Sequence, residues 1–351
     1  MDGLREWGAA LDGVRVVGLG ESTHGTAEFF RLKHRLVEHL VTEHGFRTFA
    51  MEASASAALA VDGYVRRGEG DGAAALAGLG FWTWRTREVL DLVEWLRAYN
   101  RGRRSADQVG FVGVDPQRCA ASVAHFGERA GVLSVLADAQ PGSLPGRGAE
   151  LAAAARALPV VSGDDQRHAR ILARAVDVVS APRPELFRVR DGHMADAVGE
   201  LIAADPGARI ALWAHNGHVA VRGRSLGAQL RERYGSAYYA LGLFFGEGAF
   251  RARRMWPGPW GPRLKRPSPV AVNRIGPPPP GSLEALLAER GAHVRDLRSA
   301  AELWLWEPLP SRSYGAYVSR GVYRRNVTPT VPAEEYDGLA YVPVSTPSVP
   351  Y

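Results

Sequence analysis

The stretch that decides the fold is residues 14–25, VRVVGLGESTHG. Its first seven residues form a short apolar run that ends in glycines, which predicts a buried β-strand. Polar residues follow at once. From Thr26 to His44 apolar residues recur at helical spacing, and Gly45 is a typical helix end. A buried strand that passes through a polar turn into an amphipathic helix is typical of the start of an α/β protein.

Strand and helix continue to alternate over the first third of the chain. Short apolar runs predict strands at 48–51 and 109–114, and helical periodicity predicts helices over about 54–67 and 86–100. Parallel strands need long crossover connections, and helices of this length supply them. This order predicts an α/β fold with a central, mostly parallel sheet flanked by helices.

The middle and the end of the chain depart from this alternation. Residues 116–206 are rich in Ala and Arg and predict helices without strands, which we interpret as a helical insertion or cap within a single domain over 1–351. Residues 252–282 are rich in proline and are expected to be irregular. The other expected elements are strands at 208–213, 237–245, 303–305 and 339–342, and a short helix at 282–290.

The composition excludes several classes of protein. The 351 residues are 46% hydrophobic and 23% charged, as in an ordinary folded protein. The net charge is +6, but lysine occurs only at Lys33 and Lys265 and basic runs are short, so no nucleic-acid partner is expected. No apolar stretch approaches about 18 residues, and residues 1–7 do not resemble a signal peptide, so we expect no membrane partner and a cytoplasmic location. The lone Cys119 excludes an internal disulfide and a cysteine zinc site.

Each expected strand is followed by a candidate catalytic group. In parallel sheets, chemistry gathers beyond the carboxyl ends of the strands. The groups, in strand order, are Glu21 with His24, then Glu52, Asp115, the run from His215 through Asn216 and Gly217 to His218, and Glu247. Carboxylates and imidazoles are the usual residues of general acid-base catalysis. We therefore expect these side chains to meet at one edge of the sheet.

Other chemistries fit these residues less well. Helix capping explains Ser22 and Thr23 but does not call for Glu21 or His24. No Gly-x-Ser-x-Gly elbow is present, which argues against a serine nucleophile, and the glycines at 18 and 20 lack the third glycine of a dinucleotide-binding loop. Neither a metal nor a cofactor is expected, although a metal-dependent hydrolase stays an alternative. Its ligands would be Glu21, His24, Glu52, His215 and His218.

These residues resemble the motifs of the erythromycin esterase family. Residues 20–25, GESTHG, followed by 29–36, FFRLKHRL, are similar to the opening motif of that family. The resemblance runs from about 14 to 345. Its further matches are 51–53 (MEA), 81–84 (FWTW) with Glu88, 113–115 (GVD), Arg190-Asp191 with Met194-Ala195, 213–218 (WAHNGH), 281–284 (GSLE), 313–316 (SYGA) and Tyr336-Asp337.

The resemblance implies a reaction and roles for residues. Members of this family hydrolyse the lactone ester of macrolide antibiotics with a water molecule that a histidine activates. By position, His24 is the general base, and Glu21, Glu52, His215 and His218 complete the catalytic cluster. Some members have arginine where this chain has Lys33. Lysine supplies the positive charge but cannot form the two parallel hydrogen bonds of a guanidinium. The expected substrate-binding residues are Lys33, Trp82, Trp84, Asp115, Arg190, Asn216 and Glu247.

The expected mechanism leaves the substrate open. Glu21 or Glu52 orients His24 or the water, and His218, with His215 as a second candidate, donates a hydrogen bond to the developing oxyanion. The substrate is a macrolide-like ester or another small-molecule or peptide natural product. A tailoring enzyme that hydrolyses, eliminates or cyclises such a product is the alternative. The sequence does not distinguish a monomer from a homo-oligomer.

Overall fold

The computed structural model describes residues 4–255, 268–291, 294–325 and 327–351. Its centre is a sheet whose main path follows the order β3-β2-β4-β1-β5-β11-β7. Along this path neighbouring strands are parallel from β3 to β11, and β7 runs antiparallel to β11. The expected mostly parallel central sheet is confirmed. The strands are β1 Val16–Leu19, β2 Thr48–Ser54, β3 Gly110–Asp115, β4 Ile210–Trp213, β5 Tyr238–Met255, β7 Val294–Asp296 and β11 Gly338–Ser345.

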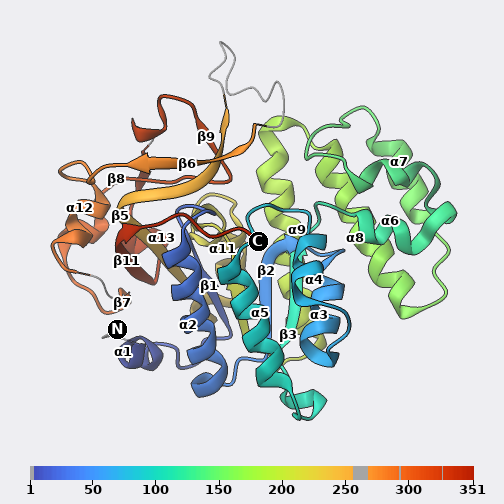
Figure 1. Ribbon diagram of the computed structural model, residues 1–351, viewed down its shortest axis with the longest axis horizontal. Helices are drawn as coiled ribbons and strands as arrows, with labels where there is room; N and C mark the ends of the chain where they lie inside the picture. Colours follow the sequence, from blue (N-terminus) through green and yellow to red (C-terminus); the bar gives the residue numbers. More distant parts are fainter. Residues whose placement is uncertain (1–3, 256–267, 292–293, 326) are drawn as a thin grey trace.

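The strand order explains why distant polar residues meet. Strand β4 comes late in the chain but pairs with both β1 and β2, so that Ile210 is in register with Val16 on one side and with Thr48 on the other. Because the three strands are parallel, their carboxyl ends lie at the same edge of the sheet. The segments that follow β1 and β4 therefore become neighbours of the end of β2 (Figure 1).

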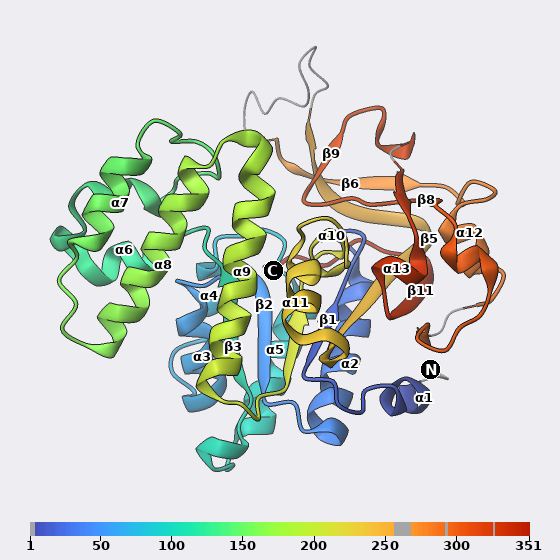
Figure 2. The same ribbon diagram turned by 180° about the vertical axis from the view of Figure 1, so that it is seen from behind.

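Helices cover both faces of this sheet. Helices α2 (Ala27–His44), α3 (Ala58–Arg67) and α5 (Arg87–Asn100) lie on the face turned toward the viewer in Figure 1. Helices α9 (Leu186–Ala204) and α11 (Leu226–Tyr234) cover the opposite face, seen in Figure 2. The apolar stripe of α2 is fully buried, and the helix ends at Gly45, whose φ of 69° is the left-handed conformation that glycine adopts freely.

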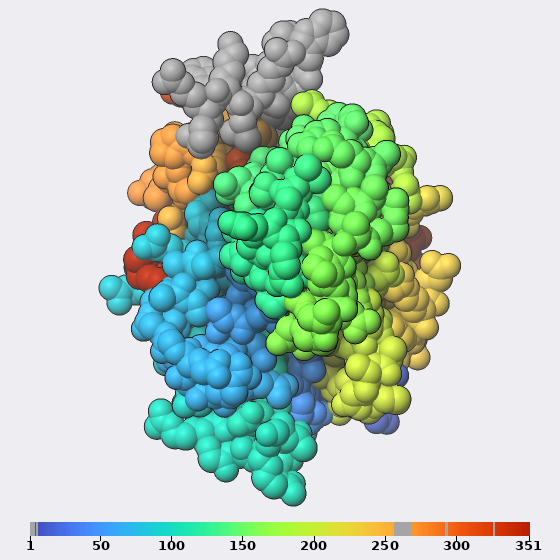
Figure 3. Space-filling model, turned by 90° about the vertical axis from the view of Figure 1, so that its right-hand side faces the viewer, coloured from blue at the N-terminus to red at the C-terminus, as the bar shows by residue number. Residues whose placement is uncertain are grey.

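The segment between β3 and β4 is built from helices joined by loops. Residues 116–206, all of which the structure describes, contain no strand. Most of them form a lobe beside the sheet that has its own apolar cluster, including Leu133, Leu151 and Leu172 (Figures 1 and 3). The exception is α9, which packs on the sheet. The lobe consists of α6 Ala120–Phe126, a 3-10 helix Gly127–Ala137, α7 Gly148–Arg156 and α8 Gly163–Ser180.

Two expectations for the last third of the chain were wrong. The proline-rich segment 252–282 is not irregular throughout, because β5 extends to Met255 and β6 (Val270–Ile275) pairs with it antiparallel; residues 256–267 lie outside the described part. The strand expected at 303–305 is a 3-10 helix, Leu303–Trp306. In a strand Leu303 and Leu305 would share a face, whereas here Leu305 is buried and Leu303 is 82% exposed.

The remaining elements are short. The helix expected at 282–290 is present as α12 (Leu283–Ala288). Within the described residues, no helix is both long enough and apolar enough to span a bilayer. The other elements are α1 Leu4–Ala9, α4 Gly72–Gly78, α10 Asn216–Val219, α13 Pro332–Glu335, β8 Leu309–Ser311, β9 Tyr317–Ser319 and β10 Thr328–Thr330, with 3-10 helices at Ser105–Asp107, Arg183–Glu185, Gly235–Ala237 and Tyr323–Arg325.

Candidate active site

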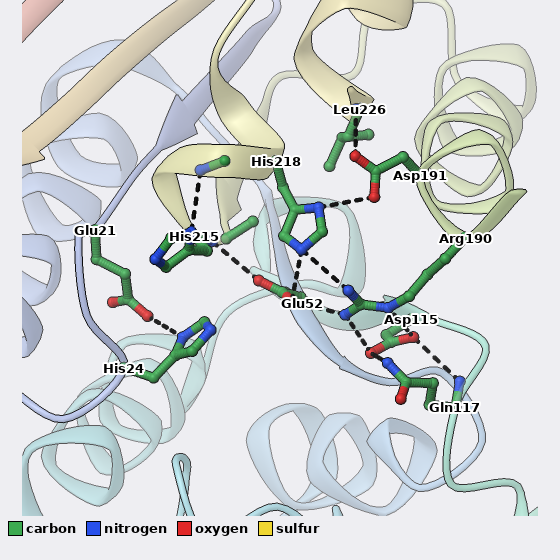
Figure 4. A network of polar contacts seen from close by, with 12 residues as sticks. Glu21, His24, Glu52, Asp115, Gln117, Arg190, Asp191, His215, His218 and Leu226 are labelled. Atoms are coloured by element: carbon green, nitrogen blue, oxygen red, sulfur yellow. Dashed lines mark hydrogen bonds and ion pairs between the residues drawn. The ribbon is translucent and has the colours of Figure 1, made fainter. Parts of the chain in front are cut away.

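The predicted catalytic residues come together at the carboxyl ends of β1, β2 and β4 (Figure 4). Glu21 and His24 follow β1, and His215 and His218 lie at the turn after β4 and in the short helix α10. Glu52 lies in β2, where the pairing with β3 shifts register between Met51 and Ser54. Such irregularities redirect side chains and are common beside active sites. All five side chains are nearly or fully buried.

Two glycines allow the first polar turn to fit against its neighbours. A side chain on Gly20 would collide with Asn216 and with the backbone of Leu241. A side chain on Gly25 would collide with the backbone of Arg251 in β5, and the Arg251 N–H donates to the Gly25 carbonyl oxygen at 3.0 Å. The glycines on either side of Glu21 and His24 therefore permit a close approach of β5 that any larger residue would block.

The first half of the cluster, which we call the base side, consists of Glu21, His24 and Lys33. One Glu21 oxygen lies 2.7 Å from His24 Nδ1, and the other accepts a hydrogen bond from Lys33 Nζ at 2.8 Å. Lys33 also donates to the carbonyl oxygen of Ala214 at 3.3 Å and lies over the Trp213 ring, 4.4 Å from its centroid.

Charge pairing keeps Glu21 and Lys33 ionised although both are buried. Burial alone would raise the pKa of Glu21, but Lys33 and His24 outweigh this effect and lower it. Burial lowers the pKa of Lys33 to about 8, against the attraction of Glu21. Because the Glu21 carboxylate accepts, His24 Nδ1 is the donor. In the described part of the chain no group hydrogen-bonds Nε2 of His24, so a neutral ring has a lone pair available there.

The second half, which we call the network side, consists of Glu52, Asp115, Arg190, Asp191 and His218. Arg190 donates to both oxygens of Asp115, at 3.1 and 2.7 Å, and to Glu52 Oε1 at 2.7 Å. Gln117 supports Asp115 through its backbone N–H and its side-chain amide, at 3.2 and 2.8 Å. Burial raises the pKa of Glu52, but His218 and Arg190 outweigh it and hold the pKa well below its usual range. Arg190 is thus a fixed cation between buried carboxylates.

His218 is enclosed by the carboxylates of the network side. Its Nδ1 lies 2.7 Å from Asp191, and its Nε2 lies 3.1 Å from Glu52 and 3.0 Å from Arg190 Nη1. Burial lowers the pKa of His218, but Glu52 and Asp191 outweigh burial and raise it to about 10. A neutral ring would accept from Arg190 at Nε2, but three carboxylates exceed the single charge of Arg190, so the ring is protonated at neutral pH.

His215 is held as a neutral ring. Its Nδ1 accepts from the N–H of Gly217 at 3.1 Å, so its proton resides on Nε2, which donates to the carbonyl oxygen of Tyr314 at 3.3 Å. Burial and the neighbouring His24 lower its pKa to about 3. Its backbone N–H donates to Glu52 Oε2 at 2.9 Å. His215 therefore ties β4 to Glu52 and to Tyr314, and both of its ring nitrogens are occupied.

The expected substrate-binding residues fall in different places. Asn216 bonds through both amide atoms to the backbone of Leu243 in β5, at 2.9 and 3.1 Å. Trp84 is buried, donates to the Glu52 carbonyl oxygen at 3.1 Å and meets the His24 ring edge-on at 5.6 Å between centroids. Trp82 is half-buried beneath the Arg251 guanidinium. Glu247 is exposed in mid-strand, because β5 continues past it, so the expectation that a strand ends there was wrong.

Sequence reasoning missed two partners of the cluster. Asp191 was seen beside Arg190 in a family-like motif but received no role, and it holds both His218 and the Leu226 N–H, the latter at 2.9 Å. Tyr314 acts through its carbonyl oxygen, which no side-chain pattern reveals. Among the residues that the structure describes, no group of three or more His, Cys, Asp or Glu is arranged to hold a metal ion.

Comparison with known proteins assigns the chain to a family. The erythromycin esterase family model matches residues 41–165 and 161–345. The chain belongs to the erythromycin esterase family. Erythromycin esterase type II of Escherichia coli is 31% identical to it over 105 residues, a match that spans 30% of this chain and only 24% of that relative. The match to the family model begins after Glu21 and His24, whose placement rests on the structure described above.

Solved structures share the fold of this esterase-family chain. A succinoglycan biosynthesis protein has a TM-score of 0.82 at 22% identity, covering 99% of this chain and 92% of its own. A Bacillus cereus protein has a TM-score of 0.77 at 22% identity, with coverage of 99% and 93%. A mutant of the erythromycin esterase EreC in its open conformation has a TM-score of 0.67 at 19% identity, with coverage of 98% and 94%.

Proposed function

We propose that this protein is a hydrolase that cleaves an ester or lactone with a water molecule activated by His24. The observation that carries the proposal is the state of the base side. His24 donates Nδ1–H to a buried carboxylate that Lys33 already balances, and its Nε2 has no hydrogen bond from the described residues. A neutral imidazole oriented in this way is suited to accept a proton from water. Membership of the erythromycin esterase family supports this reaction class.

The base side would carry the proton through the reaction. His24 Nε2 takes a proton from water as the oxygen attacks the ester carbonyl carbon, and the imidazolium that forms is stabilised by Glu21. The tetrahedral intermediate then collapses, the alkoxide leaves, and His24 returns the proton to it. Lys33 holds the second oxygen of Glu21, so that the carboxylate does not need to rotate during the cycle.

The network side would stabilise the oxyanion through a hydrogen bond from His218, because its three carboxylates outnumber its two cations and its net charge does not favour an anion. Glu52 holds the N–H of His215 and contacts Arg190 and His218, two buried cations. Both nitrogens of His218 face carboxylates, so a direct hydrogen bond to the oxyanion requires the contact with Glu52 to open. With that contact open, the protonated ring is a charged donor aimed at the oxyanion, and preorganised donors of this kind contribute strongly to catalysis.

The substrate in this proposal is a macrolide-like lactone or another natural-product ester, cleaved in the cytoplasm. We treat residues 1–351 as a single catalytic domain, because the cluster draws on residues from 21 to 218 and the carbonyl oxygen of Tyr314 completes it. The lobe of α6–α8 would then be an insertion beside the site. A tailoring reaction on a natural product, by elimination or cyclisation, would use the same base without adding water.

Hydrolysis in labelled water tests the proposal. In H₂¹⁸O, a panel of macrolide lactones and simple esters should yield an acid that carries one ¹⁸O atom by mass spectrometry. His24→Asn should abolish this product, since a general base contributes about 10²–10⁴-fold. His34→Asn, on helix α2 that follows the turn of His24 but outside the cluster, is the matched control. Turnover without incorporation of label, or full activity of His24→Asn, would overturn the proposal.

A further inference from the structure

A cavity of about 690 Å³ borders the turn that carries His215 and His218. Its walls come from the start of α9, from residues 215–225, and from the segments around β8, β10 and α13, which face the viewer in Figure 2. This volume lies within the range of about 300–1,000 Å³ that is typical of small-molecule sites. Glu21, His24 and Glu52 do not line it, so the cavity extends the site beyond the catalytic cluster.

The cavity is lined mainly by positive charge. Its four arginines are Arg188, Arg222, Arg224 and Arg312, and its carboxylates are Asp191 and Glu335. Asp191 is occupied by His218 at 2.7 Å and by the N–H of Leu226 at 2.9 Å. Burial raises the pKa of Glu335, which weakens it as a counter-charge. Arg188 is paired with Glu185, outside the lining, so the arginines left without a full counter-charge are Arg222, Arg224 and Arg312.

Arg312 contributes a buried charge that no acid balances. It is 3% exposed, and its guanidinium donates to the carbonyl oxygens of Gly276 and Pro277, at 3.0 and 2.7 Å, and to that of Gly246. No carboxylate of the described chain lies within ion-pair distance of it. The carboxyl group of Glu284 accepts from the Arg312 backbone at 2.7 Å, and burial raises its pKa to about 7. The guanidinium of Arg312 therefore places a positive charge without an ion-pair partner in the buried part of the cavity wall.

The rim adds arginines and hydroxyls that can bind an anion. Arg222 is exposed, and among the described residues its guanidinium approaches only Glu335, at 3.6 Å, and the carbonyl oxygen of Pro329, at 3.3 Å. Arg224 is exposed and its guanidinium has no partner among the described residues. Ser313 and Thr328 line the same cavity. Planar guanidinium groups with spare donors match the geometry of carboxylates and phosphates.

We infer that this cavity binds an anionic arm of the substrate, a carboxylate or a phosphate, through Arg222 and Arg224. The inference rests on the proposed esterase function. His215 lines the cavity, and its ring centroid lies 5.0 Å from that of His24. A substrate that passes His215 would place its ester at His24 and its anionic arm among the arginines. The preferred substrates are therefore esters that carry a negative charge away from the scissile bond.

Binding of simple anions tests the cavity without catalysis. Sodium succinate and inorganic phosphate are titrated into the His24→Asn protein by calorimetry at pH 7 and low salt. We expect binding of at least one anion, weakened about tenfold or more when Arg222→Ala and Arg224→Ala are added, because each removes hydrogen bonds to a charged group. Arg167→Ala with Arg170→Ala, on the exposed side of the helical lobe, is the matched control and should bind as before.

Kinetics with two esters that share a leaving group test the link to the substrate. The KM for mono(4-nitrophenyl) succinate should rise about tenfold or more in the Arg222→Ala/Arg224→Ala protein, whereas the KM for neutral 4-nitrophenyl butyrate should not change. Hydrolysis of the butyrate without binding of either anion would overturn the inference and leave the esterase proposal intact. Anion binding that the double substitution removes, with neither ester cleaved, would support the anion site and count against the esterase proposal.

Discussion

The base side and the network side are built from the same residue types but surround their histidines with different balances of charge. On the base side one carboxylate faces one lysine, so the charges balance without His24. On the network side three carboxylates face one arginine, and two of them, Glu52 and Asp191, raise the pKa of His218 to about 10. The number of carboxylates for each fixed cation decides which histidine can act as a base and which becomes a buried cation.

This difference also separates stability from catalysis. The network side joins β2, β3, α9 and α10 through buried ion pairs, so its loss should affect folding. On the base side His24 can be removed while Glu21 keeps Lys33 as its counter-charge. Substitutions on the two sides should therefore give different ratios of lost activity to lost stability.

Removal of the arginine is the strongest way to break the network side. Arg190→Met leaves Glu52 and Asp115 buried without their guanidinium. Breaking a buried pair costs about 3–5 kcal/mol, so we expect the free energy of unfolding to fall by this amount in urea denaturation. Arg190→Lys should lose less, because it keeps the charge but not the bidentate fork. His24→Asn should change this free energy by less than about 1 kcal/mol. Equal losses of unfolding free energy in Arg190→Met and His24→Asn would refute the proposed difference between the two sides.

Removal of Lys33 should make the base side behave like the network side. Without Lys33 the buried Glu21 has only His24 as a counter-charge, so we expect His24 to retain a proton and lose its function as a base. In Lys33→Met, kcat at pH 7 should fall about 10²-fold and recover as the pH rises, because alkaline solution removes that proton. Lys33→Arg keeps a cation and should keep the wild-type pH profile. An unchanged profile in Lys33→Met would contradict the proposed balance.

The sequence was sufficient to predict that the residues of the cluster lie close together. Glu21 and His24, Glu52, and His215 with His218 all follow apolar runs that predict parallel strands, and parallel strands end at one edge. Their protonation states were not predictable. The state of His218 depends on Asp191, and the tautomer of His215 depends on a carbonyl oxygen at residue 314. Such contacts form only when distant segments pack, and local patterning carries no signal for them.

The end of β5 shows a second limit. An apolar run predicts a strand over 237–245, and Glu247, just beyond it between Gly246 and Gly248, was therefore expected at the active-site edge. In the structure β11 pairs with β5 through Gly248, where φ is 116°, and β6 pairs onward from there. The glycines fit a close approach of neighbouring backbones, since a side chain on Gly248 would collide with Ser345. Pairing with β11 and β6, which come later in the chain, thus extends β5 beyond the apolar run that predicts it.

The pH dependence of stability should reveal the cation on the network side. The folded pKa of His218 is raised from 6.5 to about 10, so its stabilising contribution is fully present below pH 6.5 and is lost as the pH rises toward 10. One pKa unit corresponds to about 1.4 kcal/mol. We measure the free energy of unfolding by urea denaturation at both pH values. Between them the wild type should therefore lose at least about 1.4 kcal/mol more of this free energy than His218→Gln does. Lys33, whose pKa is lowered to about 8, titrates in both proteins, so its contribution cancels when the two losses of unfolding free energy are subtracted. Parallel curves would show that His218 is neutral.

The anchoring of the base side gives the smallest expected effect. The chain after β11 crosses the start of α2, where Glu28 accepts from the N–H and the hydroxyl of Thr346, both at 2.6 Å, and the N–H of Ser348 donates to the carbonyl oxygen of Gly25 at 3.0 Å. Glu28→Ala removes the first two bonds from a partly exposed site, so we expect a loss of about 1 kcal/mol in stability. Because Gly25 directly follows His24, kcat should fall a few-fold while KM and the pH-dependent stability assigned to His218 stay unchanged. Glu38→Ala, on the same helix but away from Thr346, is the control. If Glu28→Ala also removed the pH-dependent part of the free energy of unfolding that we assign to His218, the two sides would be mechanically coupled and would not act separately.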